Sequence, residues 1–275
     1  MSTKQSIGDS KTFHGTAKYY AQYRPEIPKA VIEYLKQSYN LDGTGTLLDI
    51  GCGTGISTVA FAPLFAKTIA FDPNKEMLDQ AIDNDSSSNI EWRLCSDSNL
   101  NLGDEVINFA IAVRSFHWLD QEKILQHIKP NMANNATIAI ISDGSFWTGK
   151  EKWQREIVKT IQEFLGESRK AGKSKNYTPS VRPYDLILKK NGISSIKTKI
   201  IPITRHWNLD SIIGYLYSTS FSAYSLYNGH NAAFEDKLKK NLLAINNGKT
   251  NFIEKAEFSI LSGSFKWGAL YIVLL

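Results

Sequence analysis

Between residues 46 and 142 of this 275-residue chain, short apolar runs rich in β-branched residues alternate with stretches of helical periodicity. The runs that predict strands are "TLLDI", "TIAFD", "IEWRLC", "VINFAIAV" and "ATIAIIS". The stretches that predict helices cover residues 56–65, 73–83 and 121–129. This alternation is typical of a parallel sheet with helices on both faces. The nearly unbroken apolar runs are typical of strands that are buried on both sides.

The flanking segments add helices and a C-terminal strand pair. Amphipathic patterns predict helices over residues 30–39, 150–166, 208–227 and 231–248. The runs "KAEFSILSGSF" and "WGALYIVLL" predict an antiparallel pair that completes the sheet. We therefore expect an α/β fold with a Rossmann-like, seven-stranded, mostly parallel sheet, helices on both faces and an inserted helical lid. The expected division is a core over 1–145, a lid over the substrate at 146–250, interleaved with core elements, and C-terminal strands at 251–275.

The turn after the first predicted strand is rich in glycine and follows an acid. "LLDIGCGTGIS" places Gly51, Gly53 and Gly55 at alternate positions behind Asp49. Dinucleotide-binding proteins use G-x-G-x-x-G at this turn to seat a pyrophosphate, and a carboxylate at close range would repel that group. The acid suits a ligand with an ammonium and a sulfonium, which describes S-adenosylmethionine. A tight turn without any ligand is the alternative.

At this point the chain resembles the class I S-adenosylmethionine-dependent methyltransferases, whose first motif is similar to "LLDIGCGTG". Three other stretches resemble the methyltransferase type 11 or trans-aconitate methyltransferase-like subgroup: "AKYYAQYRP", "RSFHWLD" and "HWNLDSIIGYLYSTSFS". The chain departs from the pattern at Asn108, where an aspartate is usual, and at His14, where an acid is common. Neither departure is expected to abolish cofactor binding.

A second acid follows the next predicted strand. Asp72 lies 21 residues past Gly51, close to the roughly 20-residue offset at which dinucleotide-binding proteins place an acid on the ribose hydroxyls. We expect Asp72 to bind the ribose. The alternative is that Asp72 caps the following helix, with Pro73 at its first position. By the resemblance, Met77 lies near the adenine; as a lone methionine it could equally be core.

The resemblance assigns further cofactor contacts. Ser96 or Asp97 reaches the adenine amine, and the sequence leaves open which of the two does so. Tyr20 and Arg24 fold over the methionine end, where Arg24 pairs with the carboxylate and the Val113 carbonyl accepts from the ammonium. A surface salt bridge is the alternative for Arg24.

His117 is the candidate catalytic residue. It could deprotonate a hydroxyl acceptor, hydrogen-bond an anionic substrate or pack structurally beside Trp118. A general base would add about 10²–10⁴-fold to the rate, and only if the acceptor must lose a proton. Trp118, Tyr215 and Phe221 are candidates for contact with the substrate, although aromatic residues at helical spacing are usually core.

Composition and charge narrow the setting. The net charge of +5 conceals a segment, residues 150–200, in which 13 Lys and Arg face 5 Asp and Glu. This segment is either a solvated face or a surface that attracts an anion. The two cysteines, Cys52 and Cys95, have no metal-ligand spacing. No apolar run approaches the roughly 18 residues of a membrane span, and the N-terminus lacks the apolar core of a secretory signal. We expect a cytoplasmic protein without a metal and without a membrane partner.

These observations predict an enzyme that methylates a small molecule, acting at the oxygen of an acidic or hydroxylated metabolite. One alternative is a nucleic-acid or other macromolecule methyltransferase, which the sequence pI near 9 suggests. The fourth strand is not followed by the Asp/Asn-Pro-Pro-aromatic run of amine-methylating DNA enzymes, and neither cysteine has the setting of a nucleophile, so we do not expect nucleic acid as the acceptor. A non-catalytic protein that binds S-adenosylmethionine is the other alternative. The oligomeric state is open.

Overall fold

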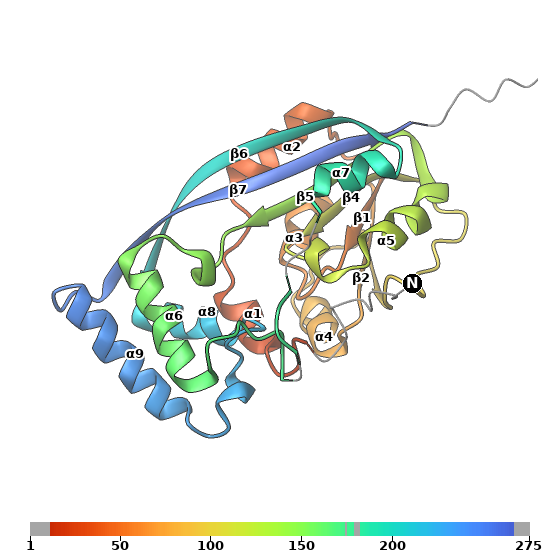
Figure 1. The fold of residues 1–275 in the computed structure, drawn as a ribbon. Helices are drawn as coiled ribbons and strands as arrows, with labels where there is room; N and C mark the ends of the chain where they lie inside the picture. The colour runs from red at the N-terminus through yellow and green to blue at the C-terminus, as the bar shows by residue number, and fades with distance from the viewer. Residues whose placement is uncertain (1–11, 174, 179–181, 267–275) are drawn as a thin grey trace, which may run out of the picture.

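A single seven-stranded sheet organises the part of the chain that the computed structural model describes, residues 12–173, 175–178 and 182–266 (Figure 1). The strand order across the sheet is β3-β2-β1-β4-β5-β7-β6. In chain order the strands are β1 (Thr46–Ile50), β2 (Lys67–Asp72), β3 (Ile90–Leu94), β4 (Ile107–Val113), β5 (Met132–Asp143), β6 (Ile193–Asn208) and β7 (Asn251–Phe265). The α/β class and the mostly parallel, Rossmann-like sheet are confirmed.

The first five strands are parallel, and β7 runs antiparallel to both of its neighbours, β5 and β6. Both edges of β7 are therefore occupied. The strand predicted over residues 267–275 lies outside the described residues. Sequence reasoning did not find β6, because this edge strand has few buried positions and includes the polar run Lys197–Lys199. β6 is one core element that lies within residues 146–250.

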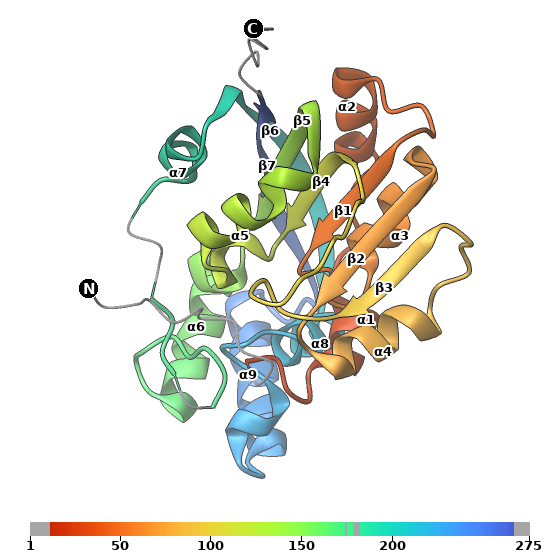
Figure 2. The ribbon, with the colours of Figure 1, turned by 90° about the vertical axis from the view of Figure 1, so that its right-hand side faces the viewer.

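Helices cover both faces of the sheet (Figure 2). The described helices are α1 (Ala17–Tyr23), α2 (Lys29–Tyr39), α3 (Ile56–Phe61), α4 (Lys75–Asp83), α5 (Gln121–Ile128), α6 (Lys152–Leu165), α7 (Tyr184–Lys190), α8 (Leu209–Tyr217) and α9 (Asn231–Ile245). Side chains of α2 and α3 share one buried cluster with the sheet, and those of α5 and α7 share another on the opposite face. Burial of these apolar faces fixes the sheet between two helical layers.

A separate helical layer, formed by α6, α8 and α9, has its own apolar core at one end of the sheet (Figure 1). Trp207 of β6 and Phe252 of β7 extend into this core. The helix predicted over 208–227 ends at Tyr217, where the hydroxyls of Ser218 and Thr219 donate to carbonyls three residues earlier. Such side-chain bonds compete with helix propagation. None of the helices in the described ranges is both long and apolar enough to cross a membrane.

A buried ion network joins the ends of the central strands. The Asp143 carboxylate, at the end of β5, accepts from Arg114 at 2.7 and 2.9 Å and also pairs with Arg205 of β6. Arg114 donates in addition to the Pro25 carbonyl at 3.0 Å. Burial alone would raise the pKa of Asp143, but the two guanidinium groups lower it to about 2. The network therefore ties the segment before α2 to β4, β5 and β6.

Asp143→Ala should destabilise the fold by about 3–5 kcal/mol, because it leaves the buried Arg114 guanidinium without its anion and leaves Arg205 with Glu254 alone. Urea unfolding measures this loss. Asp185→Ala, which removes an exposed partner of Lys189, should leave the midpoint unchanged. Equal midpoints for the wild type and the Asp143 variant would contradict the role of the network.

Candidate active site

Two adjoining cavities lie at the carboxyl ends of the central strands, where open α/β sheets bind ligands. The smaller has an empty volume of about 620 Å³ and the larger about 1000 Å³. Both are lined by the same five residues, Phe13, Tyr20, Arg114, Ser115 and Trp118. A ligand in one cavity would therefore lie directly beside a ligand in the other.

The glycine loop forms one wall of the smaller cavity through Gly51 and Gly53. Their φ angles are +70° and +57°, in the region that favours glycine. A Cβ on Gly51 would lie 2.8 Å from that of Ser115, whereas a Cβ on Gly53 would meet nothing within 4 Å. Gly55 does not line the cavity; a Cβ there would lie 2.7 Å from the ring of Trp92. The third glycine therefore serves the packing of the turn.

Asp72 lines the smaller cavity at the end of β2, next to the glycine loop. One carboxylate oxygen accepts from the N–H of Gly53 at 2.9 Å and the other from Asn74 at 2.8 Å. The N-cap of α4 is Asn74, whose side chain accepts from Met77, so Asp72 is not the helix cap. Each carboxylate oxygen keeps a second lone pair, so both could accept from vicinal hydroxyls. Burial raises the pKa of Asp72.

Asp49 lies beneath the glycine loop and is fully buried. Its Oδ2 accepts from the hydroxyls of Ser57 at 2.9 Å and Thr58 at 2.8 Å, while its Oδ1 has no hydrogen-bond partner among the described residues. Burial raises the pKa of Asp49 to about 6, despite these two hydrogen bonds. Asp49 lines neither cavity, so its influence on a ligand there would be electrostatic.

Of the remaining residues predicted to contact the cofactor, Met77 and Val113 line the smaller cavity, as Tyr20 does. Ser96 and Asp97 do not line it. The Ser96 hydroxyl bonds within its own loop, and the Asp97 carboxylate accepts from the N–H of Asp120 at 3.3 Å. The adenine contact predicted for one of these two residues remains a prediction.

Arg24 lies in the larger cavity, not among the residues that line the smaller one. Its guanidinium carbon is 4.6 Å from the ring centre of Tyr20 and 4.8 Å from that of Tyr215. It donates to the Ser218 carbonyl at 3.3 Å, and its Nε has no hydrogen-bond partner in the part of the chain that the structure describes. No salt bridge joins Arg24 to a carboxylate within the described ranges, so the predicted alternative of a surface ion pair does not hold there.

Arg169 is a second cation in this cavity, and sequence reasoning missed it. It belongs to a loop in which the N–H of Tyr177 donates to the Arg169 carbonyl and the N–H of Gly172 donates to Ser220. Its guanidinium carbon lies 4.2 Å from the ring centre of Tyr177 and 5.1 Å from that of Phe221. Among the described residues, the Nε of Arg169 has no hydrogen-bond partner and no carboxylate pairs with its guanidinium group. The surrounding run of lysines gave no sign that this one residue turns inward.

The same loop contacts the N-terminal segment. Gly172 has a φ of +74°, and a Cβ there would lie 3.1 Å from the backbone oxygen of Thr12. Phe13, next along the chain, packs edge-on against Trp118 at 5.3 Å. The loop and the N-terminal segment therefore meet over the two cavities.

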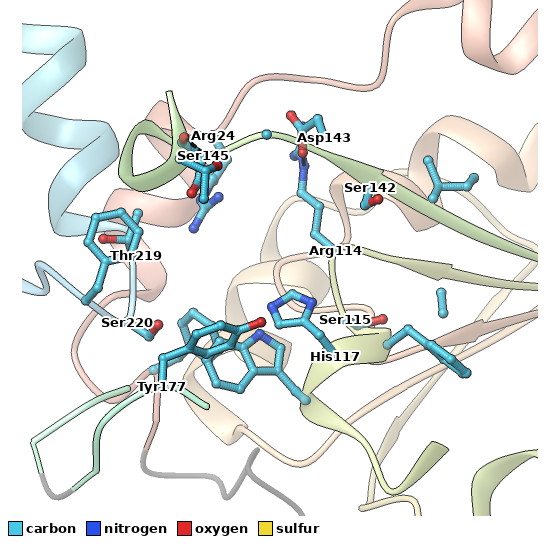
Figure 3. Close-up of a pocket in the computed structure, with 18 of the residues that line it drawn as sticks. Arg24, Arg114, Ser115, His117, Ser142, Asp143, Ser145, Tyr177, Thr219 and Ser220 are labelled. Atoms are coloured by element: carbon cyan, nitrogen blue, oxygen red, sulfur yellow. Dashed lines mark hydrogen bonds and ion pairs between the residues drawn. The ribbon is translucent and has the colours of Figure 1, made fainter. Parts of the chain in front are cut away.

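His117 faces the larger cavity together with the predicted wall residues Tyr215 and Phe221. Its ring centre is 4.8 Å from that of Trp118 and 6.1 Å from that of Tyr177. In Figure 3 the hydroxyl of Tyr177 points toward the imidazole. Burial lowers the pKa of His117 to about 4, and the charges of Arg169 and Arg24 contribute. The imidazole is therefore neutral near pH 7 and can accept a hydrogen bond or a proton.

Residues 47–134, which contain the glycine loop and Asp72, match a family model described as "Methyltransferase domain". This region is a methyltransferase domain of the S-adenosylmethionine-dependent class. Asp49, Gly51, Gly53 and Asp72 fit S-adenosylmethionine. The two carboxylates attract a cationic ligand, the glycines let it approach the backbone, and Asp72 offers two acceptor oxygens to its ribose.

Relatives of the methyltransferase domain occur in several eukaryotes. A methyltransferase-like protein of Schizosaccharomyces pombe is 27% identical over 163 residues, covering 59% of this chain and 60% of its own. A probable S-adenosylmethionine-dependent methyltransferase of Saccharomyces cerevisiae is 26% identical over 165 residues, covering 58% and 53%. The chain thus matches between half and two thirds of these relatives' length.

Solved structures share the fold of this chain, including elements outside residues 47–134. A protein of Anaeromyxobacter dehalogenans described as a type II methyltransferase superposes with a TM-score of 0.62 at 18% identity, covering 89% of this chain and 98% of that one. A phosphoethanolamine N-methyltransferase of Haemonchus contortus, in complex with phosphomonomethylethanolamine and S-adenosylhomocysteine, gives 0.55 at 12% identity, covering 94% and 59%. At these identities the likeness concerns the fold.

Asp72→Ala should weaken S-adenosylmethionine binding more than tenfold, because two charge-assisted hydrogen bonds to the ribose would be lost. Titration calorimetry measures the dissociation constant. Asp104→Ala removes an exposed acid outside the cavity-lining residues and serves as the charge control. Unchanged affinity of the Asp72 variant would remove the ribose assignment.

Cofactor affinity should also fall as the pH is lowered. The raised pKa of Asp49, about 6, means that Asp49 takes up a proton between pH 7 and pH 5 and loses its attraction for a cationic ligand. The loss should reach up to about tenfold over this range, and calorimetry at several pH values would detect it. Asp49→Asn should show a flatter pH profile; a profile as steep as that of the wild type would exclude Asp49 as its source.

Proposed function

We propose that the chain is an enzyme that transfers the methyl group of S-adenosylmethionine to an oxygen atom of a small anionic acceptor held in the larger cavity. The observation that carries this proposal is the presence of two inward-facing guanidinium groups, those of Arg24 and Arg169, without a carboxylate partner among the described residues. Burying an unpaired charge is costly, so a cavity with two such groups favours an anion as its ligand.

The arrangement of the two cavities suits a direct displacement. S-adenosylmethionine supplies an activated methyl group when bound, and the shared wall of the cavities would bring an acceptor oxygen next to it. Orientation of the two reactants can account for a large part of the acceleration, because effective molarities reach about 10⁵–10⁸ M in well-oriented systems. Aromatic walls around the larger cavity would exclude water from the reacting groups.

His117 has a role in this proposal that depends on the acceptor. A carboxylate acceptor loses no proton, so the neutral imidazole would orient it by a hydrogen bond through a protonated ring nitrogen. A hydroxyl acceptor would give its proton to the imidazole, and the low pKa of His117 would make it a weak base. The properties of His117 therefore favour a carboxylate acceptor over a hydroxyl acceptor.

The basic segment, residues 150–200, would act on the substrate through Arg169 and not through its overall positive charge. Several of its cations are exposed and pair with surface acids: Arg182 and Lys190 with Glu122, and Lys189 with Asp185. Such pairs describe a solvated face. Arg169 instead turns into the larger cavity, where its charge would act on the substrate.

Two further points support an acidic acceptor. A relative from Bacillus cereus, 26% identical over 133 residues and matched over 48% of its length, is named malonyl-[acyl-carrier protein] O-methyltransferase. The "FHWLD" run favours the trans-aconitate methyltransferase-like subgroup, and we include this subgroup in the proposal.

The proposal also includes a lid and a location. The helical layer of α6, α8 and α9 would act as the lid over the substrate. The free thiols of Cys52 and Cys95 are compatible with the cytoplasm, which we propose as the location.

A methyl-transfer assay with radiolabelled donor and a panel of carboxylic acids, alcohols and amines tests the proposal. We expect turnover with carboxylates, and a Michaelis constant for them raised by about 10–100-fold in Arg169→Gln through loss of a charge-assisted contact, with unchanged cofactor affinity. Lys159→Gln removes the same charge from an exposed position and should behave as the wild type. Preference for neutral acceptors, or equal effects of the two substitutions, would contradict an anion site at Arg169.

A further inference from the structure

A third hollow adjoins the larger cavity on the far side from the glycine loop. It has an empty volume of about 550 Å³ and lies on the face of β5, β7 and β6 that is next to the first turn of α7. Ile140, Ser142 and Tyr184 line both this hollow and the larger cavity. We call it the α7 groove. Because the two share these side chains, a molecule too long for the larger cavity could continue into the groove.

Three hydroxyl-bearing side chains from the sheet lie on the floor of the groove. Ser142 of β5 is paired in register with Ser259 of β7, and Thr198 of β6 lies on the same face. The structure gives none of these three hydroxyls a hydrogen-bond partner among the described residues, and the Tyr184 hydroxyl has none there either. Hydrogen-bonding groups are therefore available to a ligand along the groove.

The groove carries little net charge. Its one acid, Asp185, pairs with Lys189 at 3.0 Å. The lysines that flank Thr198 belong to the opposite face of the sheet, where Lys199 lies 5.5 Å from the ring centre of Tyr34 in α2. Arg24 and Arg169 line the larger cavity and do not line the groove. The two spaces therefore differ in chemistry, one suited to an anion and the other to an uncharged polar chain.

We propose that the acceptor is an extended molecule, with an anionic head in the larger cavity and an uncharged arm, bearing amide or hydroxyl groups, that passes Tyr184 and lies in the α7 groove. This inference rests on the proposed function, which places the anion beside the methyl donor. Ser142 and Ser259 hold the arm through their hydroxyls, and Tyr184 forms the boundary between head and arm. Chain length and polarity of the arm then determine specificity.

Binding of a graded series to the protein saturated with S-adenosylhomocysteine tests the inference by calorimetry. The series is succinamate and two longer forms, whose amide nitrogen carries one or two β-alanine amide units. Each hydrogen bond gained in the groove should tighten binding by about fivefold. N-hexylsuccinamate, an apolar arm of similar reach, should gain less than the amides.

Substitutions in the groove separate this effect from non-specific contact. Ser259→Trp fills the groove and should abolish the gain of the long forms while leaving succinamate binding unchanged, and Ser259→Ala should reduce the gain. Thr204→Trp adds the same side chain to an exposed position of β6 outside the groove and should leave the gain intact.

Two results would overturn the inference while leaving the proposed function in place. They are equal affinity for short and long forms in the wild type, and an undiminished gain in Ser259→Trp. A hexyl arm that binds as well as the amide arms would overturn the assignment of a polar arm. If S-adenosylhomocysteine binds but none of these anions does, the anion site itself is wrong, and the inference fails with it.

Discussion

The charge balance around Asp143 decides what the larger cavity can bind. Four arginines from different segments, Arg24, Arg114, Arg169 and Arg205, converge on this end of the sheet, and Asp143 and Glu254 neutralise Arg114 and Arg205. Arg24 and Arg169 are left with aromatic rings as their main neighbours. A cation on an aromatic face keeps its charge available to a ligand, because the ring supplies only a partial counter-charge. The internal pairing thus separates structural arginines from those that can serve an anionic substrate.

The two adjoining cavities place opposite charges next to each other. Acids on one side suit a sulfonium donor, and guanidinium groups on the other suit an anionic acceptor. Under the proposed function, this division would orient both reactants before any covalent step, and the buried, neutral His117 in the larger cavity would add no third charge there. In such a site, charged groups that are already in place stabilise the charge that changes during the reaction, and they need no reorganisation at that moment.

The cofactor-binding part of the site could be predicted from the sequence because its residues belong to short motifs within residues 47–72. An acid, a glycine turn and a second acid occupy the ends of adjacent predicted strands, and parallel strands bring such ends together. The acceptor half depends on contacts between distant segments, which a single sequence does not reveal. Arg169 and Lys170 look alike in the sequence, but only the first faces the cavity. Strand β6 escaped prediction for the same reason, because its pairing with β7 compensates for its polar composition.

The contact of Gly172 with Thr12 has a consequence for the order of events. Phe13 and Tyr20, which follow Thr12 in the chain, belong to the walls of both cavities, and Gly172 belongs to the loop that carries Arg169. Under the proposed function, a displacement of this segment wide enough to release the demethylated cofactor would also uncover the methylated product, so that release of the two products would be coupled. A side chain larger than glycine at position 172 would press on the Thr12 backbone and push this segment away from the loop.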